Sequence, residues 1–426
     1  MDRPGNKQPP VFPVEPGKIP EAELLHLSNN VPVYLIPSAT EDIVRLEFIF
    51  SAGQVKEDLP LLASFTSMML TEGSKSHTSE KLLSKIDYYG AFINLYADND
   101  RAGLIVVTLN RHASKIIELV REILFGPVFP LKELNNLIQK RVQNYRISRE
   151  RVQTLAMERF FESVFGSKHP YGRQIRETDF RKITPALLKD FHSKYYTPDN
   201  MSVIAAGRIS RNLTSMLDHT FGNLPSHSIY IEEPVSLLRG KATRKILVPK
   251  PGAVQNSVRI GSPSINKRHP DYQGLKIVNT ILGGYFGSRL MKNLREEKGL
   301  TYGIRSGVSS LDLTGFKVIS AEVNRENTRN AIEEIYREIH ILQNLPVEVK
   351  ELNVIRNFML GEMVRMFDGP FARAESFKAL HLFGLDTGYY YRFAEKIKSI
   401  NSDEIIELAR TYYKTEDLYE IIAGIP

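Results

Sequence analysis

The sequence has 426 residues, of which 42% are hydrophobic and 25% are charged, and its formal net charge at pH 7 is +7. A chain of this length is too long for one compact core, so we expect two domains in an ordinary globular protein. The absence of cysteine excludes disulfides, thiolate metal ligands and a cysteine nucleophile. The mild basic excess could favour an acidic partner, but it is also common in proteins that have none.

Membrane, secretion and nucleic-acid signals are weak or absent in the sequence. No stretch reaches the ~20 apolar residues that a membrane helix needs, so we expect no membrane association. Residues 1–20 are polar and proline-rich without the apolar core of a signal peptide, which predicts a flexible lead-in. The compartment stays open between cytoplasm and periplasm. The densest basic stretch, 140–151, fits a solvated helix face, so we expect no nucleic-acid partner.

The first half of the chain alternates strand and helix patterns. An apolar run at 31–37 predicts a strand, and in 43–53 apolar residues alternate with Arg45 and Glu47, the period of a half-buried strand. A helix follows between Pro60 and Gly73. The remaining elements expected in this half are a capped helix at 79–89, strands at 91–97 and 103–110, a helix at 112–126 and a long helical stretch at 131–166.

The second half repeats this order. Its expected elements are a strand at 257–263, helices at 270–284 and 288–299, strands at 302–310 and 314–323, a closing helix at 328–342 and a helical stretch at 347–366. Asn110-Arg111 and Asn324-Arg325 precede the two closing helices. We interpret this as an internal duplication of one α+β unit rather than coincidence. The predicted domains are 21–222 and 246–426, joined by a linker at 223–245 that is rich in prolines and charges.

Local motifs for metal binding and nucleophilic catalysis are missing. No two of the ten histidines lie four residues apart, and after His77 and Glu80 a lysine occupies the position of a second ligand. The segment 78–80 is better interpreted as a helix N-cap. No G-x-S-x-G elbow occurs, although a dispersed serine triad is not excluded by sequence. The glycine-rich segment 282–289 lacks the end of a Walker loop, and we interpret it as a hinge or close-packed turn between helices.

The stretch NLREEKGLTYG, residues 293–303, places Tyr302 seven residues after Arg295. Arginine and tyrosine both offer rigid hydrogen-bond donors. If both side chains point into one cleft, they could hold a carbonyl oxygen while negative charge develops on it. In the alternative, Arg295 forms a surface ion pair with Glu296 or a neighbour, and Tyr302 packs against the sheet. The residues alone leave the two interpretations even.

The run LGGYFGSRLMKNLREEKGLTYGIRSG, residues 282–307, closely resembles the C-terminal domain of the M16 family of zinc peptidases, which includes the mitochondrial processing peptidase. The resemblance covers nearly the whole chain. It implies an α+β fold of two homologous domains, each a mostly antiparallel sheet packed with helices, that together form a half-clamshell. It also implies that Arg295 and Tyr302 assist the scissile peptide opposite the metal. By the same resemblance, the strand in 90–100 pairs with an extended peptide near Asn94 and Ala97.

The zinc half of the family pattern is absent from this sequence. Active members carry H-x-x-E-H in the first long helix, and the matching histidine positions here hold Ser64 and Met68, with Ser67 at the glutamate position. The third ligand should fall near Asn144, and no acid occurs from 134 to 149. Hydroxyl, thioether and amide groups do not replace the imidazole and carboxylate ligands that zinc prefers. We therefore expect this chain to bind no metal or other cofactor.

The sequence keeps the arginine–tyrosine motif of the family and lacks its zinc motif. This combination predicts a non-catalytic subunit of a heterodimeric M16 metallopeptidase. A partner subunit with an intact H-x-x-E-H would hold zinc, and this chain would complete the partner's active site and help bind extended peptides. No zinc peptidase activity is expected from this chain alone. The alternative is a peptide-binding or structural scaffold of the same fold with no role in hydrolysis.

Overall fold

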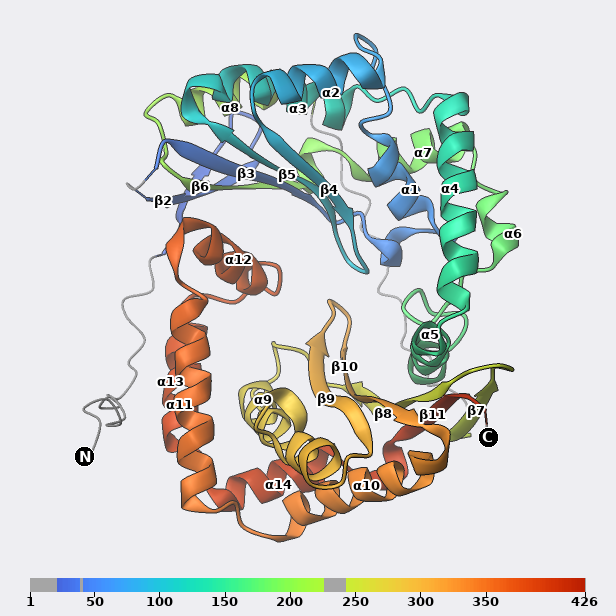
Figure 1. The fold of residues 1–426 in the computed structure, drawn as a ribbon. Helices are drawn as coiled ribbons and strands as arrows, with labels where there is room; N and C mark the ends of the chain where they lie inside the picture. The colour runs from blue at the N-terminus through green and yellow to red at the C-terminus, as the bar shows by residue number, and fades with distance from the viewer. Residues whose placement is uncertain (1–20, 39–40, 226–242, 426) are drawn as a thin grey trace, which may run out of the picture.

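The computed structural model describes residues 21–38, 41–225 and 243–425. The expected lead-in at 1–20 and most of the expected linker at 223–245 lie outside these residues, so those two predictions stay as they are. Within the described residues the chain forms two sheets, each packed with helices (Figure 1). This confirms the predicted α+β fold with two sheet-and-helix units.

The first sheet has six strands in the order β1-β2-β6-β3-β5-β4. Its strands are β1 (Glu23–His26), β2 (Pro32–Pro37), β3 (Ile43–Phe50), β4 (Phe92–Ala97), β5 (Ala102–Leu109) and β6 (Met201–Gly207). β2 and β6 run parallel, and the other neighbouring pairs run antiparallel. β4 therefore lies at an open edge of the sheet.

Helices of the first half cover one face of this sheet and extend beyond it. They are α1 (Leu62–Met69), α2 (Ser79–Tyr88), α3 (Ala113–Phe125), α4 (Leu131–Arg149), α5 (Val152–Phe165), α6 (Glu177–Phe180), α7 (Pro185–Tyr195) and α8 (Leu213–Phe221). In Figure 1, α2, α3 and α8 lie over the sheet, while α4 stands beside it. The long helical stretch expected at 131–166 is broken at Glu150 and Arg151, between α4 and α5.

The second sheet has five strands in the order β7-β11-β8-β10-β9. Its strands are β7 (Lys245–Pro249), β8 (Gln255–Ser264), β9 (Thr301–Ser310), β10 (Gly315–Asn324) and β11 (Tyr419–Gly424). β7 and β11 run parallel and the remaining pairs antiparallel. The order matches β2-β6-β3-β5-β4 of the first sheet strand for strand. The topology therefore supports the duplication read from the sequence, with β4 and β9 at equivalent edges.

The second half contains α9 (Tyr272–Asn279), α10 (Thr328–Asn344), α11 (Val349–Arg365), α12 (Gly369–His381), α13 (Gly388–Ser399) and α14 (Ser402–Tyr412). Two expected α-helical stretches contain π-helix instead, in η4 (Thr280–Gly284) and η5 (Met291–Glu297). Such wide turns are rare and occur often at functional sites. η5 carries Arg295.

The two halves exchange helices. α5 of the first half packs on β8 and β11 of the second sheet, where Phe160, Phe165 and Phe316 share one apolar cluster. α12 of the second half packs on β2 and β6 of the first sheet. Each sheet thus has part of its remaining face covered by a helix from the other half, an arrangement visible in Figure 1.

The expectation that β3 is half-buried is wrong, because α12 covers its second face. Glu47 is fully buried and Arg45 is 5% exposed. Lys378 of α12 donates to Glu47 Oε1 at 2.9 Å, and Arg45 donates to Glu47 Oε2 at 2.6 Å. Glu375 of α12 pairs with Arg45 as well. The alternating charges of β3 bind the other half of the chain instead of facing solvent.

The hairpin tips of the two sheets also meet. Arg101, after β4, pairs with Asp312, between β9 and β10. The Asp312 N–H donates to Asp100 Oδ2 at 3.1 Å, and the Tyr171 hydroxyl donates to the other oxygen of Asp100. Burial raises the pKa of Asp100. Together with α5 and α12, these contacts hold the edge strands β4 and β9 in a fixed relation.

Candidate functional site

Arg295 and Tyr302 flank a tight chain reversal between η5 and β9. The Leu300 N–H donates to the Leu294 carbonyl at 2.8 Å, and Lys298 N–H to the Asn293 carbonyl at 3.1 Å. Gly299 occupies the turn with φ of 62°, which glycine adopts without strain. The glycine break in the motif therefore lets the chain pass from the π-helix into the edge strand within a few residues.

Both side chains of the pair are exposed. Tyr302 is 94% exposed, so the alternative in which it packs against the sheet is wrong. The Arg295 guanidinium carbon lies 5.1 Å from the centre of the Phe286 ring. Among the described residues no carboxylate pairs with Arg295, whereas its neighbours Lys292 and Lys298 pair with Glu297 and Glu334. The arginine and tyrosine thus keep donors available on one edge of the second sheet.

Buried polar contacts fix the π-helix that carries Arg295. The Asn293 side chain donates to Glu334 Oε2 at 3.0 Å and to Glu338 Oε1 at 2.6 Å, both on α10. Asn293 is 8% exposed. Because both amide hydrogens are bound by carboxylates of one rigid helix, the register of η5 is tightly set.

The glycine-rich segment is a close-packed turn, as the sequence indicated. A Cβ on Gly283 would lie 2.8 Å from both the backbone nitrogen and the Cβ of Ser306 on β9. Beyond it, the Tyr285 ring lies 4.7 Å from that of Phe358 on α11, and Phe286 is 64% exposed beside Arg295. The turn therefore joins η4, β9 and α11 and presents an aromatic ring next to the arginine.

Of the four positions that correspond to the family's zinc site, the three on α1 hold groups with structural partners. On α1, Ser64 Oγ donates to the Leu61 carbonyl at 3.1 Å, and the buried Ser67 Oγ donates to the Tyr96 carbonyl at 3.0 Å. Met68 packs against the first core, and Asn144 is exposed on α4. Ser67 thereby ties α1 to the edge strand β4.

These residues do not fit a zinc ion. Two hydroxyls, a thioether and an amide lack the imidazole or carboxylate donors that zinc takes in proteins. Within 21–38, 41–225 and 243–425, no group of three or more histidine, aspartate or glutamate residues is arranged to hold a metal. A mechanism that uses a metal bound at this helix is therefore not available to these residues.

The strand expected to bind peptide is an edge strand. β4 pairs with β5 on one side only, with Asn94 opposite Ile105 and Ala97 opposite Ala102. The Asn94 side chain is exposed, while Ala97 is partly buried at the end of the strand. Such an edge can accept an extended peptide through main-chain bonds. The roles of Asn94 and Ala97 in binding stay predictions.

Sequence patterns missed the buried acid at the start of α1. Glu57 accepts from the N–H groups of Leu61 and Ala63 at 3.2 and 3.0 Å, and Arg173 lies 3.1 Å from its Oε1. Burial raises the pKa of this carboxyl to about 7, although these hydrogen bonds act in the opposite direction. Its position between a 3₁₀ turn and a helix, rather than in a motif, left no signal in the sequence.

The fold and this site define a class of protein: two repeated α+β domains, an exposed arginine–tyrosine pair in the second, and no local metal ligands in the first. Residues 182–359 match the family model described as the peptidase M16 inactive domain. This segment of the chain therefore resembles the M16 family.

Curated relatives are similar to this chain over a longer stretch. An uncharacterized zinc protease of Bacillus subtilis, YmxG, is 21% identical over 343 residues, which span 79% of this chain and 82% of the relative. An uncharacterized zinc protease of Rickettsia felis is 21% identical over 336 residues, 78% of this chain and 79% of that protein. Both similarities extend across far more of the chain than the matched domain.

Two solved structures share the fold over nearly the whole chain. A peptidase M16 inactive domain from Pseudomonas fluorescens has a TM-score of 0.83 at 22% identity, covering 95% of this chain and 98% of that one. A protease from Helicobacter pylori has a TM-score of 0.86 at 18% identity, covering 96% and 100%. In the part of the chain that the structure describes, no helix is both long and apolar enough to cross a membrane.

Proposed function

We propose that this chain is the non-catalytic subunit of a two-component M16 peptidase and supplies Arg295 and Tyr302 to the active site of a partner. The partner subunit would carry H-x-x-E-H and with it the zinc, the water and the general base. The observation that carries the proposal is the availability of the pair. Tyr302 is 94% exposed, and Arg295 has no carboxylate partner among the described residues.

The chemistry of the pair suits the tetrahedral intermediate that forms when water attacks a peptide carbonyl. A guanidinium and a phenol both donate hydrogen bonds, and donors aimed at a carbonyl oxygen stabilise the negative charge that develops there. Their supports are rigid: η5 is bound to α10 through Asn293, and Tyr302 is the second residue of β9 in the second sheet. Rigid support matters because preorganised donors need no rearrangement when the reaction occurs.

The edge strand β4 would contribute peptide binding. Main-chain pairing accepts peptides of almost any sequence, which suits a subunit that holds substrate without cleaving it. The alternative function, a peptide-binding or structural scaffold with no role in hydrolysis, shares this strand but has no use for an exposed arginine–tyrosine pair.

The test compares peptide hydrolysis by this chain, by an H-x-x-E-H partner that co-purifies with it, and by the mixture. We expect activity from the mixture above that of either chain alone. In the mixture, Arg295→Ala or Tyr302→Phe should lower kcat by about 10²-fold, the usual cost of removing one such donor.

Arg329→Ala and Tyr88→Phe serve as matched controls. The Arg329 side chain is 90% exposed on α10 and Tyr88 is 83% exposed on α2. Both controls should leave hydrolysis unchanged. If the mixture containing Arg295→Ala or Tyr302→Phe keeps full activity, the pair does not act in catalysis and the scaffold function is favoured.

A further inference from the structure

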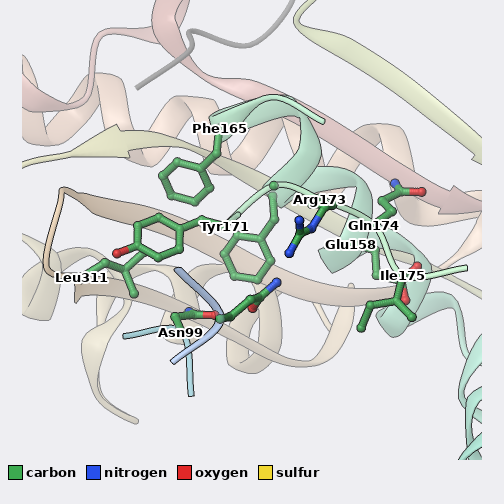
Figure 2. Close-up of a pocket in the computed structure, with 11 residues that line it drawn as sticks. Asn99, Glu158, Phe165, Tyr171, Arg173, Gln174, Ile175 and Leu311 are labelled. Carbon is green, nitrogen blue, oxygen red and sulfur yellow. The ribbon is translucent and has the colours of Figure 1, made fainter. Parts of the chain in front are cut away.

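A cavity of about 160 Å³ lies where the two halves of the chain meet. Its walls come from α5, from the segment that follows α5, from the hairpin tips of both sheets and from the turn at Gln54, and Figure 2 shows the residues that line it. Leu311 is the wall residue from the second half. An engineered apolar cavity of about 150 Å³ can hold benzene, so the space suits one amino-acid side chain.

One side of the cavity is aromatic. The rings of Phe161 and Phe165 stack with their centres 6.1 Å apart, and the Tyr171 ring meets Phe165 edge-on at 5.5 Å. The Tyr171 hydroxyl is held by Asp100, so that ring is fixed in place. An apolar occupant would gain from leaving water here and would contact rings that already have a set geometry.

The charged residues in the lining are already paired. Arg173 is bound by Glu57 at 3.1 Å, although its Nε has no hydrogen-bond partner among the described residues, and Glu158 is bound by Arg149. A charged occupant would therefore enter a largely apolar space without a free counter-charge, which costs free energy. An uncharged occupant faces no such cost.

The polar groups that remain suit a peptide main chain. Gln54 donates through Nε2 to the Pro170 carbonyl at 2.9 Å, which leaves its amide oxygen as an acceptor. The Asn99 carboxamide has no hydrogen-bond partner among the described residues, so both its donor and its acceptor are available. One peptide unit offers a matching N–H and C=O.

The cavity lies near the end of the edge strand. Asn99 lies two residues beyond Ala97, where β4 ends. The turn is held by bonds from the N–H groups of Gln54 and Val55 to the carbonyls of Asp98 and Asn99, at 2.9 and 2.8 Å. A peptide laid along β4 would therefore pass close to this cavity at the tip of the hairpin.

We propose that this cavity is a subsite for one uncharged apolar side chain, aromatic or branched aliphatic, of an extended peptide bound along β4. The proposal rests on the peptide binding in the proposed function but requires no hydrolysis and no partner subunit. It gives the chain a preference for peptides with an apolar residue at one position.

The experiment measures binding of fluorescently labelled peptides of about 12 residues, long enough to cover a strand and its continuation, to the full chain alone by anisotropy. One peptide is polar with a single central phenylalanine, and its partner has serine there. Burying a phenylalanine side chain should make the first bind roughly 10- to 100-fold more tightly. Asn99→Ala should weaken binding of the phenylalanine peptide about 3- to 10-fold, and Phe161→Ala should reduce the difference between the peptides.

Asn357→Ala, at an exposed amide on α11, is the matched control and should bind both peptides as the unaltered chain does. Melting curves establish that each variant is folded, and the comparison of the two peptides on the unaltered chain needs no variant. Equal affinity for both peptides, binding of neither, or an Asn99→Ala result equal to that of Asn357→Ala overturns the proposal. Loss of the proposed catalytic role, seen as full activity with Arg295→Ala, leaves this peptide selectivity in place.

Discussion

The buried contact between Glu47 and Lys378 should contribute several times more to the free energy of unfolding than an exposed ion pair does. Glu47 is fully buried and accepts from Arg45, Lys378 and the Tyr96 hydroxyl at 2.6, 2.9 and 2.9 Å. Glu47→Gln keeps the shape but leaves buried cations without their carboxylate. Breaking a buried pair in this way costs about 3–5 kcal/mol, and because Glu375 still contacts both cations, we expect about 3 kcal/mol.

Urea unfolding followed by far-UV circular dichroism measures this cost. A double-mutant cycle with Lys378→Met isolates the link between the two halves, and we expect a coupling energy of about 1–2 kcal/mol. The matched control is Glu118→Gln with Lys115→Met, an exposed pair on α3 whose side chains are 56% and 59% exposed. That pair should contribute less than about 0.5 kcal/mol. If Glu47→Gln costs no more than Glu118→Gln, the buried network does not hold the halves together.

Three further changes test other parts of the structure. Burial raises the pKa of Glu57 from 4.5 to about 7, so the folded chain holds that proton more tightly than the unfolded chain. The free energy of unfolding should therefore fall by about 3 kcal/mol as the pH rises from 4.5 to 7. Glu57→Gln should flatten this slope in urea titrations at several pH values. Burial lowers the pKa of Lys317 from 10.5 to about 8, so between these pH values the unfolded chain binds the proton more tightly than the folded chain. The free energy of unfolding should therefore rise as the pH increases from about 8 to 10.5. Lys317→Met should remove that rise and stabilise the chain by about 2 kcal/mol at pH 7. Gly283→Ala should destabilise by about 1–3 kcal/mol in thermal melts, because its Cβ would meet Ser306, while Gly361→Ala, with open space around it, should be neutral or stabilising.

Local sequence patterns predicted most of the helices and strands, because helix caps and strand periodicity depend on residues that are neighbours in the sequence. Thr78 caps α2 as expected, accepting from the Lys81 N–H, and the strands expected at 91–97 and 103–110 appear as β4 and β5. The repeat of strand and helix order, which needs no knowledge of packing, led to the correct α+β fold of two similar units.

Features that depend on contacts across the chain could not be predicted in this way. An alternating strand with Arg45 and Glu47 has the same pattern whether its polar face meets water or the charged residues of α12. The π-helical form of η5 depends on bonds to α10 from Asn293, 41 and 45 residues away in sequence. Similarly, the residues that line the cavity come from five separate segments.

The candidate site was only partly accessible from sequence. The exposure of Tyr302 shows that its side chain does not pack on the sheet, but its catalytic role stays a prediction. Resemblance located Ser64, Ser67 and Met68, and geometry adds that Ser67 binds the carbonyl of Tyr96. The sequence does not distinguish a polar side chain that has a hydrogen-bond partner in the fold from one that has none.

The exchange of α5 and α12 sets the order in which this protein can finish folding. α12 contacts β6 of the first sheet, and the Glu47–Lys378 bond joins residues 331 positions apart. A ribosome must therefore release most of the chain before one face of the first sheet is covered. Until then that face exposes Ile36, Ile49 and Ile204, which pack against Ala374 once α12 arrives. During synthesis the first half is consequently the part that most needs protection from aggregation.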